Sequence, residues 1–246
     1  SKMRVIPILT FLALTSAPVA AAPVIFDFAN LKYNGGINTG FLPTDGFACS
    51  GGDLCSSTIA TLLSGDLTFT NGGLTVHAQG SYDGKAFGYK AAVVQDHENG
   101  YNGKLSGRDA IGAGLGVYHK NNDTSDDNIT SKETLWLHFD QVVSLSSVGL
   151  RSEGHNTTGW DRGATFKYGF DNSTWTEGLL PRYVGQFDLS HTGQDFYFRF
   201  GGDKADQFYI SSLTVSAVPE PETYAMLLAG LGLLGFMARR RKESAT

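Results

Sequence analysis

The chain has 246 residues, of which 41% are hydrophobic and 17% charged, and its formal net charge is −5. The two ends are rich in basic residues, so residues 22–217 carry 13 basic and 21 acidic side chains, a net charge of −8. An acidic segment without a basic stripe argues against nucleic acid as a partner. Its length suits one domain of ordinary size.

The first residues have the composition of a secretory signal peptide. Lys2 and Arg4 precede an apolar segment at residues 5–14, and small residues follow at 16–22. The apolar segment is too short to span a membrane, and Val19-Ala20-Ala21 fits a cleavage site with small residues. We therefore expect residues 1–21 to be a signal peptide and the protein to be exported.

Residues 22–217 contain short alternating segments and no sustained helical period of apolar residues. Asn71-Gly72-Gly73 stands between two alternating segments, which predicts a β-hairpin. Many of the 31 glycines of the chain mark turns. The pattern predicts an all-β fold, an antiparallel β-sandwich resembling a jelly roll. The expected strands cover residues 24–28, 67–70, 74–77, 87–94, 115–118, 135–139, 142–150, 164–170, 183–189, 196–200 and 208–215.

Cys49 and Cys55 are the two cysteines of the chain. In an oxidising compartment a pair this close in sequence is expected to form one disulfide. The spacing differs from the C-x-x-C of redox enzymes, so the predicted role is structural.

An acidic segment predicts a calcium site. Calcium prefers several oxygen ligands, and closely spaced carboxylates and amides supply them. The segment is not an EF-hand, because Asn128 stands where that loop needs glycine, and Glu133 comes one residue early. The alternative is a solvated acidic loop. The candidate ligands are Asp123, Asp126, Asp127, Asn128 and Glu133.

Sequence motifs of enzymes are mostly missing, so we expect a protein without catalytic activity. The chain has no G-x-S-x-G, no H-E-x-x-H and no phosphate-binding Gly-Lys loop. A pair of carboxylates for glycoside hydrolysis stays open, because space and not sequence brings such a pair together. Glu133, Glu153 and Glu177 are candidates, whereas His138 is predicted to be an ordinary strand residue.

Two tryptophans are candidates for sugar binding. Trp160 and Trp175 stand in polar surroundings, and an exposed indole can stack on a sugar ring. The alternative is that both cap the ends of the sandwich core. Trp136 lies in an apolar strand and is expected in the core.

The C-terminal segment, residues 218–246, has three parts. Pro219-Glu220-Pro221 is expected to be extended, because proline disfavours helix. An uncharged apolar run at 224–238 follows, with a helical length of about 23 Å against the roughly 30 Å of a hydrocarbon core. The run is thus a marginal transmembrane helix. A basic cluster ends the segment, namely Arg239, Arg240, Arg241 and Lys242.

This order of parts resembles the PEP-CTERM sorting signal of Gram-negative bacteria. The resemblance implies export through the inner membrane, transient anchoring by the C-terminal helix, and processing by exosortase near Pro219-Glu220-Pro221. It implies a location at the cell surface or in the extracellular matrix, often beside exopolysaccharide and biofilm systems. The resemblance covers residues 218–242 and implies no activity for residues 22–217.

Three functions are therefore open. The first is a secreted, non-catalytic surface or matrix protein that associates with exopolysaccharide. The second is a carbohydrate-binding module, with calcium as a cofactor. The third is a hydrolase that acts on polysaccharide.

Overall fold

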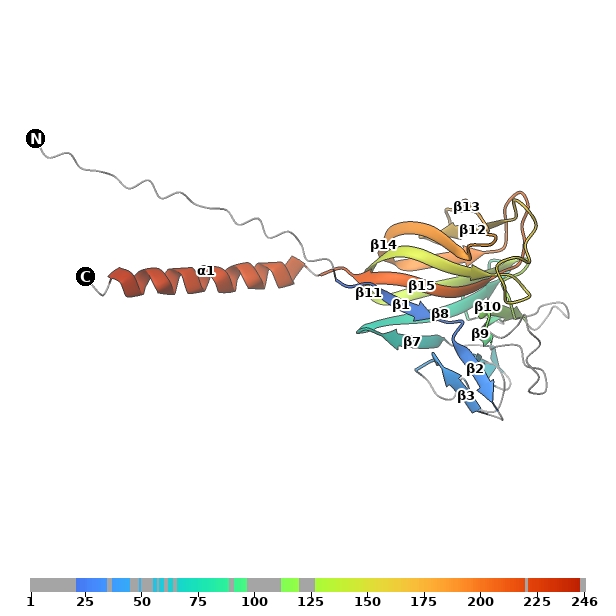
Figure 1. Ribbon diagram of the computed structural model, residues 1–246, viewed down its shortest axis with the longest axis horizontal. Helices are drawn as coiled ribbons and strands as arrows, with labels where there is room; N and C mark the ends of the chain where they lie inside the picture. Colours follow the sequence, from blue (N-terminus) through green and yellow to red (C-terminus); the bar gives the residue numbers. More distant parts are fainter. Residues whose placement is uncertain are drawn as a thin grey trace, which may run out of the picture.

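The computed structural model describes most of the chain between residues 21 and 243 (Figure 1). Residues 1–20 of the predicted signal peptide lie outside the described residues, as do Asp123, Asp126 and Glu220. The described residues are 21–34, 37–44, 49, 55–56, 58–59, 62–63, 66–88, 91–96, 112–119, 127–219 and 221–243.

Fifteen strands and one helix make up these residues. Eleven strands form one curled antiparallel sheet, which confirms the predicted all-β antiparallel class. In chain order the elements are β1 (Val24–Asp27), β2 (Leu31–Asn34), β3 (Ile37–Gly40), β4 (Cys55–Ser56), β5 (Thr58–Ile59), β6 (Leu62–Leu63), β7 (Leu67–Asn71), β8 (Leu74–Tyr82), β9 (Ala91–Asp96), β10 (Gly114–His119), β11 (Glu133–Arg151), β12 (Thr165–Gly169), β13 (Thr176–Leu179), β14 (Gln186–Arg199), β15 (Tyr209–Ala217) and α1 (Pro221–Glu243).

The long strand β11 connects two layers of the sheet. Its first half pairs with β8 and its second half with β15, while β14 runs along the other edge of both halves. The pairing with β14 is interrupted between His138 and Val143. At this irregularity the sheet changes direction, since a bulge bends a strand and increases its twist. One layer therefore contains β7, β8, β12 and β13, and the other contains β1, β4, β9, β10 and β15.

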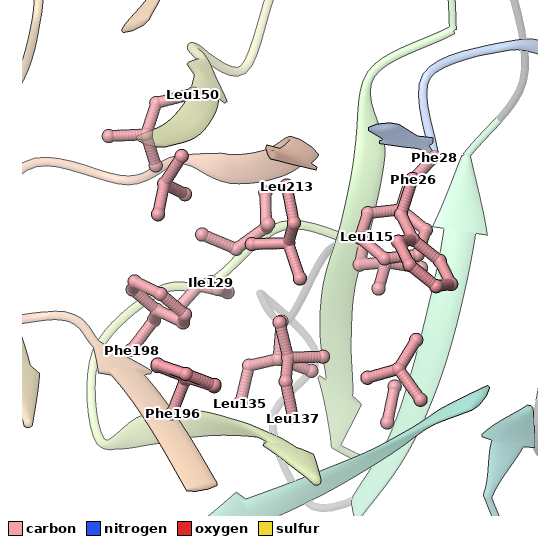
Figure 2. Close-up of a cluster of buried hydrophobic side chains, with 14 of the residues drawn as sticks. Phe26, Phe28, Leu115, Ile129, Leu135, Leu137, Leu150, Phe196, Phe198 and Leu213 are labelled. Atoms are coloured by element: carbon pink, nitrogen blue, oxygen red, sulfur yellow. The ribbon is translucent and has the colours of Figure 1, made fainter. Parts of the chain in front are cut away.

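The core lies between these layers. Along β11 the inward side chains alternate with outward ones, and Leu135, Leu137 and Phe139 are fully buried. Phe26 of β1 packs edge-on against Phe139, with ring centroids 5.6 Å apart. Figure 2 shows part of this cluster, in which apolar side chains from β1, β10, β11, β14 and β15 gather.

The predicted hairpin is confirmed. β7 and β8 pair from Asn71↔Leu74 onward. The connecting residues Gly72 and Gly73 have φ of 55° and 77°, which is the left-handed backbone that a two-residue hairpin of this type requires. Two other predicted pairs of strands are single strands in the structure. Residues 135–139 and 142–150 both belong to β11, and 183–189 and 196–200 both lie largely within β14.

The predicted disulfide between Cys49 and Cys55 is confirmed. Cys55 is fully buried in β4, which pairs with the end of β9 at Gln95. The bridge therefore attaches Cys49 to a strand of the sheet.

Helix α1 follows β15 and extends away from the strands (Figure 1). It begins at Pro221, so the expectation that Pro221 is extended is wrong. Proline is tolerated in the first turn of a helix, where its missing N–H has no helical partner. Side chains 225–237 are all exposed, and most are apolar. No helix within the described ranges combines the length and apolarity needed to cross a membrane.

Candidate functional site

The first layer of the sheet has a partly exposed aromatic surface on the side away from the core. The strand register places Gln79 of β8, Trp136 of β11, Tyr197 of β14 and Gly169 of β12 in one row. The side chains of Gln79, Trp136 and Tyr197 point away from Leu135 and Leu137, because neighbouring residues of a strand face opposite sides. We call this surface the outer face, formed by Gln79, Phe87, Trp136, His138, Lys167, Trp175, Asp195, Tyr197 and Arg199.

Four aromatic rings form the centre of the outer face. Trp136 and Tyr197 are stacked, with 5.9 Å between ring centroids and an interplanar angle of 3°. Phe87 lies against both, at 5.2 Å from Trp136 and 5.8 Å from Tyr197. Trp175 meets Tyr197 edge-on at 6.4 Å. All four side chains are partly exposed, so they form one aromatic patch accessible from outside.

A tight turn brings Trp175 to this patch. The strand β12 ends at Gly169, where a Cβ would collide with the carbonyl oxygen of Thr174. Because glycine has no Cβ, the turn can fold back over the end of the strand. Asp171 stabilises the turn by accepting hydrogen bonds from the backbone N–H groups of Ser173 (2.7 Å) and Thr174 (2.6 Å). Trp175 follows directly.

Hydrogen bonds orient the polar rim of the patch. The indole Nε1 of Trp136 donates to Oδ1 of Asp195 at 2.8 Å, and Nδ1 of His138 lies 2.8 Å from the same oxygen. His138 is a strand residue, as predicted, and its partner Asp195 stands opposite it on β14. These contacts restrain the indole of Trp136 and leave its ring partly exposed.

Two pKa shifts belong to this region. The side-chain hydrogen bond from Ser173, followed by the backbone hydrogen bonds, lowers the pKa of Asp171 to about 2. Partial burial raises the pKa of the Tyr197 phenol, and the negative charges of Asp195 and Asp171 raise it further. Tyr197 is therefore a hydroxyl donor, and Asp171 a carboxylate, at neutral pH.

The structure separates the two tryptophans proposed for sugar binding. Trp175 is on the outer face, but Trp160 is only 1% exposed and its Nε1 donates to the carbonyl oxygen of Gln207 at 2.9 Å. For Trp160, the structure therefore supports the alternative to sugar binding, because its side chain packs against the core. The prediction of Trp136 in the core is wrong, since this side chain lies outside it. Strand alternation could have indicated this, because Leu135 and Leu137 occupy the opposite side.

Three of the predicted calcium ligands lie among the described residues. The hydroxyl of Tyr209 donates to Oδ1 of Asp127 at 2.6 Å, and the N–H of Thr130 donates to Oε2 of Glu133 at 2.9 Å. Asn128 and Glu133 are fully buried. Within the part of the chain that is described, no group of three or more His, Cys, Asp or Glu side chains could hold a metal ion. The proposed ligands Asp123 and Asp126 lie outside that part.

The other two carboxylates considered for hydrolysis accept hydrogen bonds from distant parts of the chain. Oε2 of Glu153 accepts from Nε2 of Gln207 at 2.5 Å. Oε2 of Glu177 accepts from the N–H of Asp203 at 2.9 Å.

The C-terminal segment joins directly to the sheet. The N–H of Val218 donates to the carbonyl oxygen of Val142 at 3.3 Å, immediately after β15. Helix α1 follows, and near its end the guanidinium of Arg240 lies 5.7 Å from the Phe236 ring centroid. An apolar helix with exposed side chains on all faces needs another apolar surface to cover it.

Comparison with protein-family models matches residues 217–242 to the PEP-CTERM protein-sorting motif. The match covers Pro219, Pro221 and the basic cluster of Arg239, Arg240 and Arg241, together with the apolar helix. Comparisons with curated proteins and with solved structures gave no match. The chain therefore carries a PEP-CTERM sorting motif at its C-terminus, which supports recognition by exosortase, export and sorting to the cell surface.

Proposed function

We propose that this protein is a non-catalytic component of the extracellular matrix and that it binds polysaccharide through the outer face. The observation that carries the proposal is the partly exposed patch of Phe87, Trp136, Trp175 and Tyr197. Aromatic rings offer apolar faces and edges to the C–H groups of a sugar, and polar neighbours bond its hydroxyls.

The polar groups around the patch support the same function. Sugar hydroxyls both donate and accept hydrogen bonds, so a binding surface needs both kinds of partner. Gln79 and Asp195 offer acceptors, while Tyr197 and Arg199 offer donors. A sheet surface also suits an extended polymer better than an enclosed pocket does, since several sugars can lie along it.

Delivery to the cell surface supports the proposal, because it would bring the site near extracellular polysaccharide. The sorting motif directs the protein to the cell surface. The PEP-CTERM resemblance implies that exopolysaccharide is an extracellular polymer there. A matrix protein in this position would connect cells to polysaccharide without changing it chemically.

The direct test is a glycan array probed with the full-length chain, followed by calorimetry on the glycans retained. We expect Trp136→Ala to weaken binding by tenfold or more, as is usual for a central aromatic side chain at an interface. Tyr183→Ala is the matched control, since Tyr183 is 67% exposed but lies outside the outer face. Equal affinity of the two variants, or no glycan bound by the parent chain, would refute the proposal.

Processing by exosortase is tested separately in the native host. Intact-mass measurement of the surface-located protein should find the mature chain without the apolar helix and its basic cluster. A mature protein that still carries Arg239, Arg240 and Arg241 would contradict cleavage near Pro219-Glu220-Pro221.

A further inference from the structure

The charged groups of the outer face differ in whether they have hydrogen-bond or ion-pair partners within the protein. Each carboxylate on or beside this face has a donor. The donors are His138 and the Trp136 indole for Asp195, Gln79 for Asp66, His77 for Asp140, the N–H of Asp203 for Glu177, and the N–H groups of Ser173 and Thr174 for Asp171.

The two cations of the outer face, Arg199 and Lys167, differ from its carboxylates in this respect. Arg199 and Lys167 are register neighbours on β14 and β12, so their side chains emerge side by side. Among the described residues, neither side chain forms an ion pair or donates a hydrogen bond. Both are partly exposed. Their positive charges are therefore available to a ligand.

Arg199 is also held against the aromatic patch. Its guanidinium carbon lies 4.5 Å from the centroid of the Trp175 ring, a cation–π contact that restrains the long side chain. Tyr197 is two residues earlier on the same face of β14. A sugar in contact with Tyr197 and Trp175 would thus bring its substituents within reach of the guanidinium.

The chemistry of these groups favours an anion. A guanidinium presents a planar fork of N–H donors that matches the two oxygens of a carboxylate. The Tyr197 phenol is protonated at neutral pH, as is usual for tyrosine, and can donate to the same anion. The domain carries a net charge of −8 over residues 22–217, so an acidic polymer would be repelled elsewhere and bound at Arg199 and Lys167.

We propose that the outer face selects acidic polysaccharide, in which the sugar ring contacts the aromatic patch and its carboxylate binds Arg199 and Lys167. This inference rests on the proposed function and names the class of its ligand.

The test uses the full-length chain and two oligosaccharide backbones, oligogalacturonate and oligomannuronate. Each is offered as the free acid and as the methyl ester, which keeps the ring and removes the charge. We expect the free acids to bind about fivefold more tightly than the esters, the upper range for a partly exposed ion pair. The difference should shrink as salt is raised, because salt screens exposed charges.

Substitutions test whether the two cations cause the difference in affinity between the acids and the esters. Arg199→Gln and Lys167→Gln should each weaken binding of the acids more than binding of the esters, and Arg199→Lys should restore part of the loss. Arg182→Gln is the matched control, since Arg182 also lies over an aromatic ring, Tyr183, but outside the outer face. Thermal unfolding of each variant checks that the fold is retained.

The outcomes separate the two proposals. Equal binding of acid and ester, or a loss that is equal for both in Arg199→Gln, overturns the preference for carboxylates while polysaccharide binding stands. If neither form of either backbone binds while the glycan array retains other glycans, the preference for acidic polysaccharide is overturned and the proposed function stands. If the array also retains no glycan, the proposed function itself is refuted.

Discussion

The indole of Trp136 and the phenol of Tyr197 lie parallel on neighbouring strands, with 5.9 Å between ring centroids. They are direct partners in the register of β11 and β14. Cross-strand aromatic pairs of this kind stabilise a sheet by about 0.5–1.5 kcal/mol beyond the area that they bury. The pair therefore supports the fold in addition to forming the proposed binding surface.

This contact predicts an energetic coupling between the two side chains. In a double-mutant cycle of Trp136→Ala and Tyr197→Ala, urea unfolding should give a coupling free energy of about 0.5–1.5 kcal/mol. The single variants should remain folded, since both side chains lie outside the core. Additive effects of the two substitutions would show that the rings do not stabilise each other.

A substitution at Gly169 should disturb the aromatic patch. In Gly169→Ala the new methyl group meets the carbonyl oxygen of Thr174, so the turn at 171–174 must move and Trp175 with it. We expect a loss of about 1–3 kcal/mol in the free energy of unfolding, as for other overpacked sites, and a change in tryptophan fluorescence. In the control Gly193→Ala, the added Cβ meets only the end of the His191 side chain, at 3.2 Å. Unchanged stability and fluorescence in Gly169→Ala would contradict this account of the turn.

Asp171 predicts a pH dependence of the same turn. Its pKa in the folded protein is about 2, against 3.8 for the unperturbed group, mainly through the hydrogen bond from the Ser173 side chain. Because the folded pKa is the lower one, the stabilisation is present above pH 3.8 and is lost as the pH falls towards 2. NMR titration of the Asp171 carboxyl should give a midpoint near 2, and Ser173→Ala should raise it. A midpoint near 3.8 in the parent chain would disprove these hydrogen bonds in solution.

The calcium ion predicted from the acidic segment stays a prediction. One described feature favours a ligand there: Asn128 is fully buried, and within the described ranges neither polar atom of its side chain has a hydrogen-bond partner. With a dissociation constant of about 1 mM, about 10 mM calcium would stabilise the fold by about 1.4 kcal/mol. The melting temperature should rise by a few degrees, and more than with magnesium.

Asp127→Asn tests this site with little change in shape, because the amide oxygen can still accept the hydrogen bond from Tyr209. It should remove most of the calcium effect. The same melting temperature in chelator and in calcium would leave the segment as an acidic loop without a metal.

The fold class could be predicted because short patterns of neighbouring residues indicate it. Alternation in the strands and the glycines of the Asn71 hairpin are properties of a few adjacent residues, and the C-terminal motif is continuous in the sequence. The merging of two predicted strands into β11 was not visible, because the irregularity between His138 and Val143 contains no glycine or proline to mark it. The pairing of β2 with β3 was also missed.

The candidate site could be predicted only in part, because its members come from four strands and two loops. Trp175 was identified from its polar surroundings, but the same reasoning suggested Trp160, which tertiary packing buries in the core. Trp136 was assigned to the core from the apolar character of its strand, although its position in the alternation points outward. Register between β11 and β14, which joins Trp136 to Tyr197, cannot be read from either strand alone.

The most direct test of polysaccharide binding at the outer face uses the three tryptophan side chains as internal reporters. In a ¹⁵N–¹H spectrum of the full-length chain, each indole N–H gives its own signal. Titration with oligogalacturonate or oligomannuronate should shift the signals of Trp136 and Trp175 and leave that of Trp160 unchanged, because Trp160 is buried in the core. Saturating ligand that shifts none of the three signals, or shifts Trp160 alone, would contradict binding at this face.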